Sequence, residues 1–223
     1  MGIEMKHTMT TATLVLLLTL AGGAASADNN IGIGVKAGTL GIGLEGRWQP
    51  LPYIDFRLGM NRYDIDDEGS QAGINYNATL NLDTLYGTAN FRFPLSPFRV
   101  TAGVFSNGNE LQMQSIDTPT FDIGGTSYSS AEVGTLRSVT AFSGSAPYLG
   151  FGYDFSLFGK VGLNMDFGAL WQGEPNVTMT TDGLLANDQN FQQSLENERL
   201  QIEDEMSDYK AWPVLSLGFV FNF

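Results

Sequence analysis

The chain has 223 residues, 43% of them hydrophobic, so it is long enough for one domain with a substantial core and too apolar to stay disordered. Its formal net charge of -13 argues against nucleic acid as a partner, and the absence of cysteine excludes disulfides, zinc–thiolate sites and thiol chemistry. The 27 glycines and 15 phenylalanines are typical of a strand-rich protein with many tight turns.

The segment 1–27 has the three parts of a secretory signal peptide. A short polar start precedes the aliphatic run Leu14 to Leu20, and Ala25-Ser26-Ala27 provides a small-x-small cleavage site. Cleavage after Ala27 would leave 28–223 as the mature, exported protein. No later stretch has the roughly 18 consecutive apolar residues of a transmembrane helix.

Apolar and polar residues alternate along much of the mature segment, and a period of two places them on opposite faces of a strand. In the last segment, for example, Leu215, Leu217 and Phe219 share one face. The stretch 31–48 changes phase between Thr39 and Leu40, so it is either two strands with a tight turn or one strand with a bulge. The other expected strands are 53–63, 79–93, 98–113, 146–156, 159–174 and 210–223.

These strands predict an all-β fold, a closed antiparallel transmembrane β-barrel. Two strands in 31–48 make the total eight, an even number with both ends on one side of the membrane. A further pair of strands inside 121–142 would give ten, and a second phase change near Asp83 predicts a bulge within 79–93. A soluble sandwich is the alternative, but the Gly-, Arg- and Asp-rich polar faces fit a cramped, wet lumen better.

The lengths of the connections predict an orientation, because outer-membrane barrels have short periplasmic turns and long external loops. The turns at 49–52, 94–97 and 155–159 are short. The connections 64–73, 115–144 and 175–209 are long and are expected outside the cell. The aromatic residues near the short turns predict an interfacial girdle; they are Trp48, Tyr53, Phe91, Phe93, Phe98, Phe155 and Phe158, with Phe223 at the same rim.

Charged residues on the polar strand faces are the candidate functional set. Eight strands leave an interior just wide enough for side chains, and buried charges require partners. The set therefore predicts an ion-pair network that fills the barrel, although a narrow polar path and a catalytic carboxylate pair stay open as alternatives. The pore-lining or ion-pair candidates are Lys36, Glu45, Arg47, Asp55, Arg57, Arg92, Arg99, Lys160 and Asp166.

Enzymatic and metal chemistry have little support in the sequence. The one histidine, His7, lies in the segment that cleavage removes, so histidine-based catalysis is not expected, nor is a cofactor. Asp64, Asp66 and Glu68 have the spacing that begins a calcium loop, but its twelfth position would be Asn75 instead of a bidentate glutamate. They are therefore weak candidates for divalent-ion binding in a solvated loop.

The segment 187–209 predicts one amphipathic helix before the last strand. Phe191, Leu195 and Ile202 recur at helical spacing, and Met206 and Tyr209 continue the series. Asn187 or Asp188 is the expected N-cap. Its acidic opposite face leaves two interpretations, a helix packed over the barrel mouth and a helix that binds a partner.

Several of these runs resemble OmpA-type and porin-like small outer-membrane barrels. The run Gly41 to Met60 resembles the second and third strands of OmpA-type barrels, and Ala146 to Gly152 resembles a later strand of porin-like barrels. Near the C-terminus, the polar-x-Gly-x-x-aromatic-x-aromatic pattern is similar to the signal that the barrel-assembly machinery reads. Its positions are Ser216, Gly218, Phe221 and Phe223.

This resemblance implies a location in the outer membrane of a Gram-negative-type cell. The implied partners are outer-membrane lipid and lipopolysaccharide, the barrel-assembly machinery and periplasmic chaperones, whereas an external partner is not specified. Two functions stay open. One is a narrow porin-like channel for ions or small solutes, and the other is a non-conducting surface barrel that adheres or binds a partner through its acidic external loops.

Overall fold

The computed structural model describes residues 31–71, 74–142, 144–157, 160–207 and 210–223, and most of them lie in antiparallel strands. The predicted signal peptide and its cleavage site lie outside the described residues. In this part of the chain neither helix combines the length and apolar character that crossing a membrane requires.

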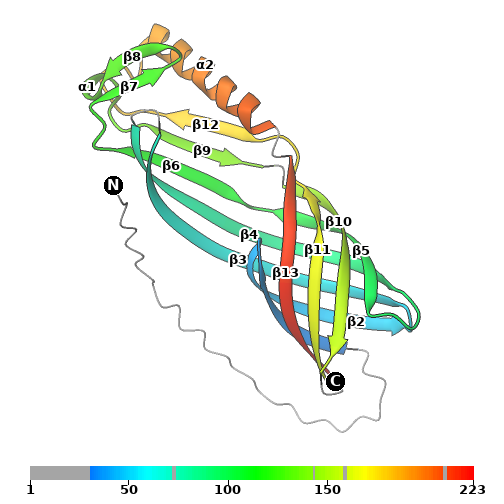
Figure 1. Cartoon of the computed structure of the whole chain (residues 1–223). Coiled ribbons are helices and arrows are strands. Elements are labelled where there is room, and N and C mark those ends of the chain that lie inside the picture. Colours follow the sequence, from blue (N-terminus) through cyan, green and yellow to red (C-terminus); the bar gives the residue numbers. More distant parts are fainter. Residues whose placement is uncertain (1–30, 72–73, 143, 158–159, 208–209) are drawn as a thin grey trace, which may run out of the picture.

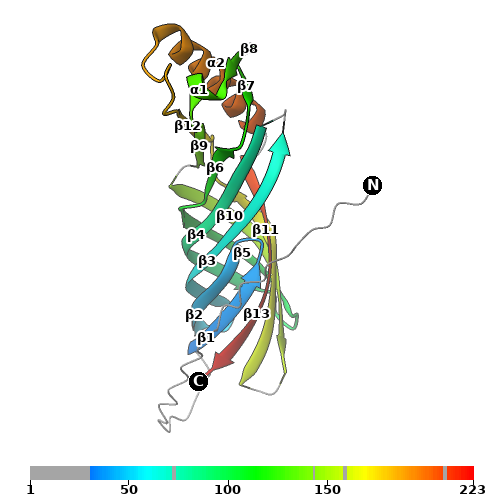
Figure 2. The same ribbon diagram turned by 90° about the vertical axis from the view of Figure 1, so that its left-hand side faces the viewer.

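Eight strands form a closed ring (Figures 1 and 2). The predicted all-β barrel is therefore confirmed, and the ring has the predicted number of strands. The strands of the ring are β1 (Ile31–Gly38), β2 (Gly41–Leu51), β3 (Ile54–Gln71), β4 (Ile74–Arg92), β5 (Phe98–Asn107), β10 (Ser145–Ser156), β11 (Val161–Trp171) and β13 (Ala211–Asn222).

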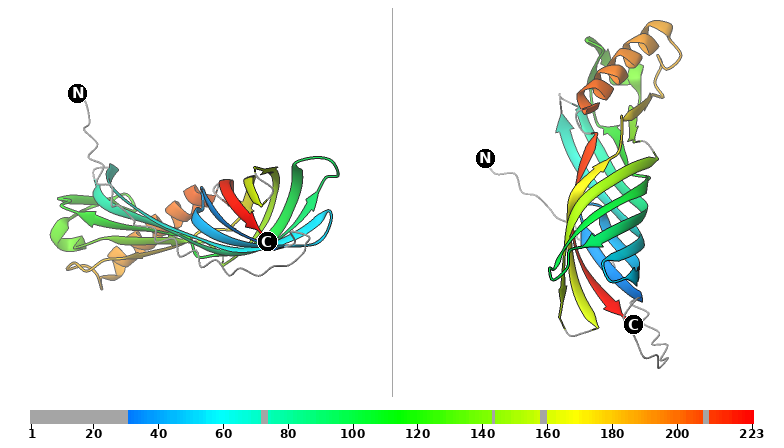
Figure 3. Two further views of the ribbon diagram at one scale, coloured as in Figure 1. Left: turned by 90° about the horizontal axis from the view of Figure 1, so that it is seen from below. Right: turned by 90° about the vertical axis from the view of Figure 1, so that its right-hand side faces the viewer.

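Antiparallel pairing closes this ring without a free edge. Each strand pairs with the next one in the order given, and β13 pairs with β1. The turns β2–β3 and β4–β5 lie at one end, which we call the short-turn end. The backbone N–H of Phe223 donates to the carbonyl of Ile31, so the first strand, β1, begins and the last strand, β13, ends at this short-turn end (Figure 3).

The phase change in 31–48 marks a hairpin between two strands. Gly38 pairs with Gly41, so Thr39 and Leu40 form a two-residue turn. Leu40 turns inward and is 5% exposed, whereas the Thr39 hydroxyl donates to the Pro213 carbonyl at 2.8 Å. The two-strand interpretation is therefore correct.

The outward face of the ring is an apolar belt. Along β1, β2 and β13 outward side chains are exposed, and inward ones are buried or half-buried. Soluble monomers rarely leave so large a continuous apolar surface in water. The belt includes Ile31, Ile33, Leu44, Phe56, Leu58, Met60, Leu85, Phe91, Phe98, Val104, Leu149, Phe151, Phe167, Leu215, Leu217 and Phe219.

Beyond the ring, at the opposite end, the sheet continues. We call residues 63–71 and 74–82, together with the three strands that follow them in the sheet, the sheet extension (Figure 1). A separate hairpin and two helices accompany it. These elements are β6 (Glu110–Ile116), β9 (Arg137–Ala141) and β12 (Asn176–Thr180) in the sheet, and β7 (Thr120–Ile123), β8 (Thr126–Ser129), α1 (Ser130–Val133) and α2 (Gln189–Met206) beside it.

The long connections are therefore more ordered than the sequence predicted. The expected loop 64–73 is largely the continuation of β3 and β4. Strands do form inside 121–142, but β7 and β8 make their own two-stranded sheet and β9 joins the extension, so the ten-stranded alternative is wrong.

The predicted strand 98–113 is interrupted. Gly108 and Asn109 separate β5 from β6, and both bond to Asp83 of β4: the Gly108 N–H donates to its carbonyl at 2.8 Å, and the Asp83 N–H donates to the Asn109 side chain at 3.0 Å. On the ring side of this break β5 pairs with β10, and on the extension side β6 pairs with β9. The break thus separates the ring from the extension.

The bulge predicted near Asp83 is absent, because β3 and β4 pair without a register shift from Ile54 to Gln71. The strand keeps its phase, and its surroundings change instead. Tyr86 and Leu82 point to the same side of β4. In residues 84–92, toward the short-turn end, the apolar side chains are on the outward side of the strand. In residues 74–82, in the extension, they are on the inward side. This exchange of faces marks the upper limit of the apolar belt.

Helix α2 packs on the extension, so the expectation that it covers the barrel mouth is wrong. Its contacts include β12, β7 and β8. Phe191 and Leu195 are buried against Phe121 and Ile123, which gives the extension its own core. The predicted cap is confirmed, because the Asp188 carboxylate accepts the N–H groups of residues 190 and 191 at 3.0 Å.

Placing an arginine in the belt tests its lipid-facing role. Leu58 points outward from the middle of residues 54–62, the part of β3 that lies in the ring, and is 66% exposed. We expect Leu58→Arg to lower the free energy of unfolding in phospholipid vesicles by about 2–4 kcal/mol, because the guanidinium would lie in hydrocarbon. The matched control is Asp66→Arg, on the same face of the same strand but above the exchange of faces, with little change expected. Equal effects in urea titrations would contradict the belt assignment.

Candidate functional site

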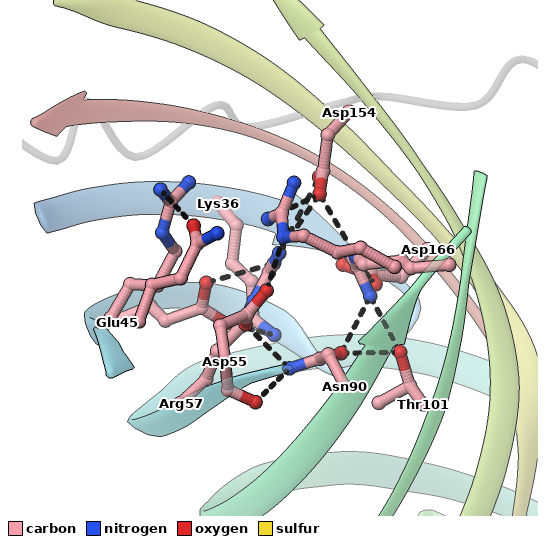
Figure 4. Close-up of polar contacts among 12 residues, drawn as sticks. Lys36, Glu45, Asp55, Arg57, Asn90, Thr101, Asp154 and Asp166 are labelled. Carbon is pink, nitrogen blue, oxygen red and sulfur yellow. Dashed lines mark hydrogen bonds and ion pairs between the residues drawn. The ribbon is translucent and has the colours of Figure 1, made fainter. Parts of the chain in front are cut away.

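The charged side chains that point into the ring meet in one layer across the lumen (Figure 4). They come from seven strands, β1 to β5, β10 and β11, and alternation turns each of them inward. Most of the sequence-predicted candidates are in it. We call this set the ion-pair layer; its members are Lys36, Glu45, Asp55, Arg57, Arg92, Arg99, Asp154 and Asp166.

Arg57 on β3 lies at the centre of the layer. Its Nε is 3.0 Å from Asp55 Oδ1, and its Nη1 is 3.2 Å from Glu45 Oε1. Its Nη2 is 3.3 Å from Asp154 Oδ2. The guanidinium is buried, so three carboxylates replace the water that it loses.

Asp154 on β10 joins three arginines. Its Oδ2 lies 2.6 Å from Arg92 Nη2 and 3.1 Å from Arg99 Nε, in addition to the contact with Arg57. Arg99 is 1% exposed; it also pairs with Asp166 and donates to the Asn90 side chain at 2.9 Å. The layer thus joins β3, β4, β5, β10 and β11 through side chains as well as through backbone pairing.

Tyr86 links the ion-pair layer to an apolar layer above it. Its hydroxyl donates to Glu45 at 2.8 Å, and the Lys36 ammonium lies 4.1 Å from the centre of its ring. Its ring stacks on Phe105 at 4.7 Å, and Phe105 in turn contacts Tyr148 at 5.3 Å. The apolar layer also contains Leu40, Ala146, Leu170 and Val214, with Trp212 packed against it.

Inward glycines make room for these large side chains. A Cβ at Gly59 would overlap the Tyr86 hydroxyl, and a Cβ at Gly152 would overlap the Arg99 guanidinium. These glycines are required by close approach, since an eight-stranded barrel is just wide enough for its contents.

Two spaces in the lumen differ greatly in size. The cavity between the ion-pair layer and the apolar layer measures 10 Å³, which is at most one water molecule. At the short-turn end a vestibule of 560 Å³ opens, lined by Arg47, Arg92 and Asp154 among others. The vestibule therefore ends at the ion-pair layer.

Three positions depart from the sequence-predicted set. Lys160 is exposed in the turn before β11, so it lies outside the lumen. Arg47 is in the lumen wall, but its bonding partner is Gln49 at 3.0 Å instead of a carboxylate. Asp154 was missed, although it shares the parity of Gly150 and Gly152 in the predicted strand 146–156.

The weak metal candidates Asp64, Asp66 and Glu68 lie on the outward face of β3, exposed to solvent. A straight strand holds alternate side chains apart, so they do not surround a common point; Asp66 accepts the Thr79 hydroxyl at 2.7 Å. Among the described residues no group of three or more His, Cys, Asp or Glu side chains could hold a metal ion.

The proposed assembly signal lies on β13 with its expected alternation. Ser216 points inward and its hydroxyl is 3.2 Å from Asp166, and inward Gly218 leaves room for Asn164. Phe221 and Phe223 are outward and meet edge to face at 5.2 Å. The aromatic residues expected in a girdle lie at the short-turn end, except that Phe158 is outside the described residues; Trp48, Tyr53, Phe91, Phe93, Phe98 and Phe155 are all exposed.

A smaller polar cluster fixes α2 to the extension. Glu203 accepts the N–H of Val177 at 3.0 Å and pairs with Arg199 at 2.6 Å, while Arg199 also pairs with Glu196. The Val177 N–H and the Arg199 guanidinium lower the pKa of Glu203. These bonds also occupy the outer edge of β12, which would otherwise be a free sheet edge.

Comparison with solved structures agrees with this architecture. The crystal structure of Acinetobacter baumannii CarO is 24% identical, with a TM-score of 0.59 over 87% of this chain and 98% of that chain. Acinetobacter baumannii CarO2 is 22% identical, with the same TM-score of 0.59 over 86% of this chain and 98% of that chain. A major outer membrane protein from Thermus thermophilus is 14% identical, with a TM-score of 0.40 over 86% of this chain and 98% of that one. The sequence matches no protein-family model and no curated protein.

The closed eight-stranded antiparallel barrel of this chain is therefore a fold similar to that of the two CarO structures. At these identities the likeness defines the fold, and function must be argued from the site.

Removing one charge from the ion-pair layer tests its energetic role. Asp154→Asn leaves three arginines with a weaker acceptor, and breaking a buried ion pair costs about 3–5 kcal/mol, less where water reaches the group. Because the Asp154 side chain is 15% exposed, we expect the free energy of unfolding to fall by about 3 kcal/mol or less. The measurement is the urea midpoint in vesicles, which should be lower than that of the original protein. Exposed Asp64→Asn is the control, with no shift expected. An unchanged midpoint for Asp154→Asn would mean that the layer does not hold the ring together.

Proposed function

We propose that this protein is an outer-membrane β-barrel with a closed lumen, which holds the sheet extension and α2 at the cell surface. The observation that carries the proposal is the arrangement of the two lumen layers, which leave a cavity of 10 Å³ between them. The function is then structural or recognition at the surface, and not passage of solutes.

The lumen contents support a closed barrel. Ions cross a pore through a continuous hydrated path, yet the described side chains leave 10 Å³ between the layers. Each acidic member of the ion-pair layer already contacts at least one cation within 3.6 Å, so few charges are available to replace an ion's hydration shell. The narrow channel that the sequence also allowed stays the alternative.

The apolar belt and the aromatic girdle support a membrane location, and the short turns support a periplasmic position for the end where they lie. The proposed partners follow from this location. They are outer-membrane lipid and lipopolysaccharide along the belt, and periplasmic chaperones and the barrel-assembly machinery, which would read Ser216, Gly218, Phe221 and Phe223. The closer relationship to OmpA-type barrels stays a prediction.

The outward face of the extension supports a surface role, because it is polar where the belt below it is apolar. Asp64 and Asp66 on β3 lie beside Thr79 and Asn81 on β4. Such a face suits water or a polar partner, and α2 adds exposed acidic groups. We therefore favour recognition of a polar external partner.

Electrical recording tests the closed lumen. We expect the refolded mature protein in planar bilayers to give no current steps in concentrated potassium chloride, because both layers block the path. A larger porin added afterwards to the same bilayer is the control for detection, and a heat-modifiable gel band confirms folding of the sample. Reproducible steps from the folded protein would overturn the closed barrel in favour of the narrow channel.

Labelling tests the location and the orientation, and the absence of native cysteine makes it direct. Leu184, beside α2, is 83% exposed, and Leu95, in a short turn, is fully exposed. On intact cells we expect a membrane-impermeant maleimide to label Leu184→Cys but not Leu95→Cys. After permeabilisation of the outer membrane both variants should react. The reverse pattern, or labelling of neither variant in the membrane fraction, would contradict the proposed orientation.

A further inference from the structure

The lumen holds one more positive charge than its acids neutralise. In the described ranges the acids of the lumen are Glu45, Asp55, Asp154 and Asp166. The cations are Lys36, Arg47, Arg57, Arg92 and Arg99, and ion pairs within 4.0 Å join all of them except Arg47 to these acids.

Arg47 is held in the wall with unused donors. Its Nη2 donates to Gln49, whereas its Nε is buried and makes no hydrogen bond within the part of the chain that the structure describes. A guanidinium has five N–H donors, and burying them without partners costs free energy. Arg92 Nη2 also makes no hydrogen bond, but it lies 2.6 Å from the Asp154 carboxylate, and Arg57 and Arg99 likewise contact carboxylates, whereas Arg47 contacts none within the described residues.

Arg47 also lies where a ligand has access. It lines the 560 Å³ vestibule together with Arg92, whose Nε and Nη2 already contact Asp55 and Asp154. The rest of the lining mixes polar residues, among them Gln49, Ser156 and Asn222, with apolar ones, among them Leu51 and the inward-pointing Val220. The vestibule thus combines an uncompensated cation with a small apolar surface, and its volume is in the range of small-molecule pockets.

We propose that the vestibule binds a small organic carboxylate with a short apolar tail. Arg47 would hold the carboxylate through paired N–H donors, with the positive field of Arg92 beside it, and the tail would lie along Leu51 and Val220. Because the ion-pair layer closes the inner end of the vestibule, the ligand enters and leaves at the short-turn end. The inference needs only the vestibule, so it stands whether or not the barrel conducts.

Equilibrium dialysis with radiolabelled hexanoate tests the proposal on the mature protein in phosphatidylcholine nanodiscs, with empty nanodiscs subtracted. We expect saturable binding that Arg47→Gln weakens about tenfold or more, the effect of losing a charged hydrogen bond. Arg47→Lys keeps the charge but loses the paired donors, so an intermediate weakening is expected even if the glutamine variant folds poorly. Lys160→Gln removes an exposed cation at the same end of the barrel and should bind like the original protein.

Two further ligands separate the parts of the proposal. Hexanol has the same tail without charge, and its uptake should not depend on Arg47. Inorganic phosphate should bind more weakly than hexanoate, because it makes no use of the apolar surface. Equal hexanoate binding by the original protein and Arg47→Gln, or equal losses in Arg47→Gln and Lys160→Gln, would overturn the site. Phosphate binding as tight as hexanoate binding would overturn the carboxylate-with-tail ligand class.

Discussion

The pairing of buried charges inside a narrow ring is the interaction on which the rest of the structure depends. Charges within a membrane-spanning barrel lose water, so each must find an opposite charge or an equivalent set of hydrogen bonds. Arg57 and Asp154 meet this demand by contacting several partners at once, from strands on different sides of the lumen. The same contacts fill the space around them, so the stability of the barrel and its proposed closure would have one cause.

Strands β3 and β4 show how one uninterrupted pattern serves two environments. Around Leu58 the lipid side must be apolar and the inward side polar, whereas around Leu82 the inward side belongs to a core with water outside. A strand satisfies both by exchanging the chemistry of its faces without changing its geometry. The phase change near Asp83 was therefore correctly observed in the sequence but wrongly explained as a bulge.

The ring could be predicted because its signal is local. Alternation assigns each side chain to a face, and a barrel needs no further information to turn the charges of β2, β3 and β11 inward. Partner choice is not local. Asp154 followed the same parity, yet its role depends on the distance across the lumen to arginines on β3, β4 and β5. The prediction that Lys160 lies in the lumen was wrong for a related reason. Lys160 lies just before β11, where the alternation of a strand no longer assigns a side chain to a face.

The extension was harder to foresee because its strands are short and pair with distant segments. β9 and β12 have five residues each and are held by β6 and α2, so neither has a long alternating run of its own. A closed lumen leaves the two ends of the barrel as the surfaces where, apart from the lipid-facing belt, we propose contact with other molecules. The upper end presents a polar sheet and an acidic helix. The lower end presents a vestibule in which one arginine lacks the partner that every other lumen cation has, and that asymmetry makes the vestibule more than a residual space.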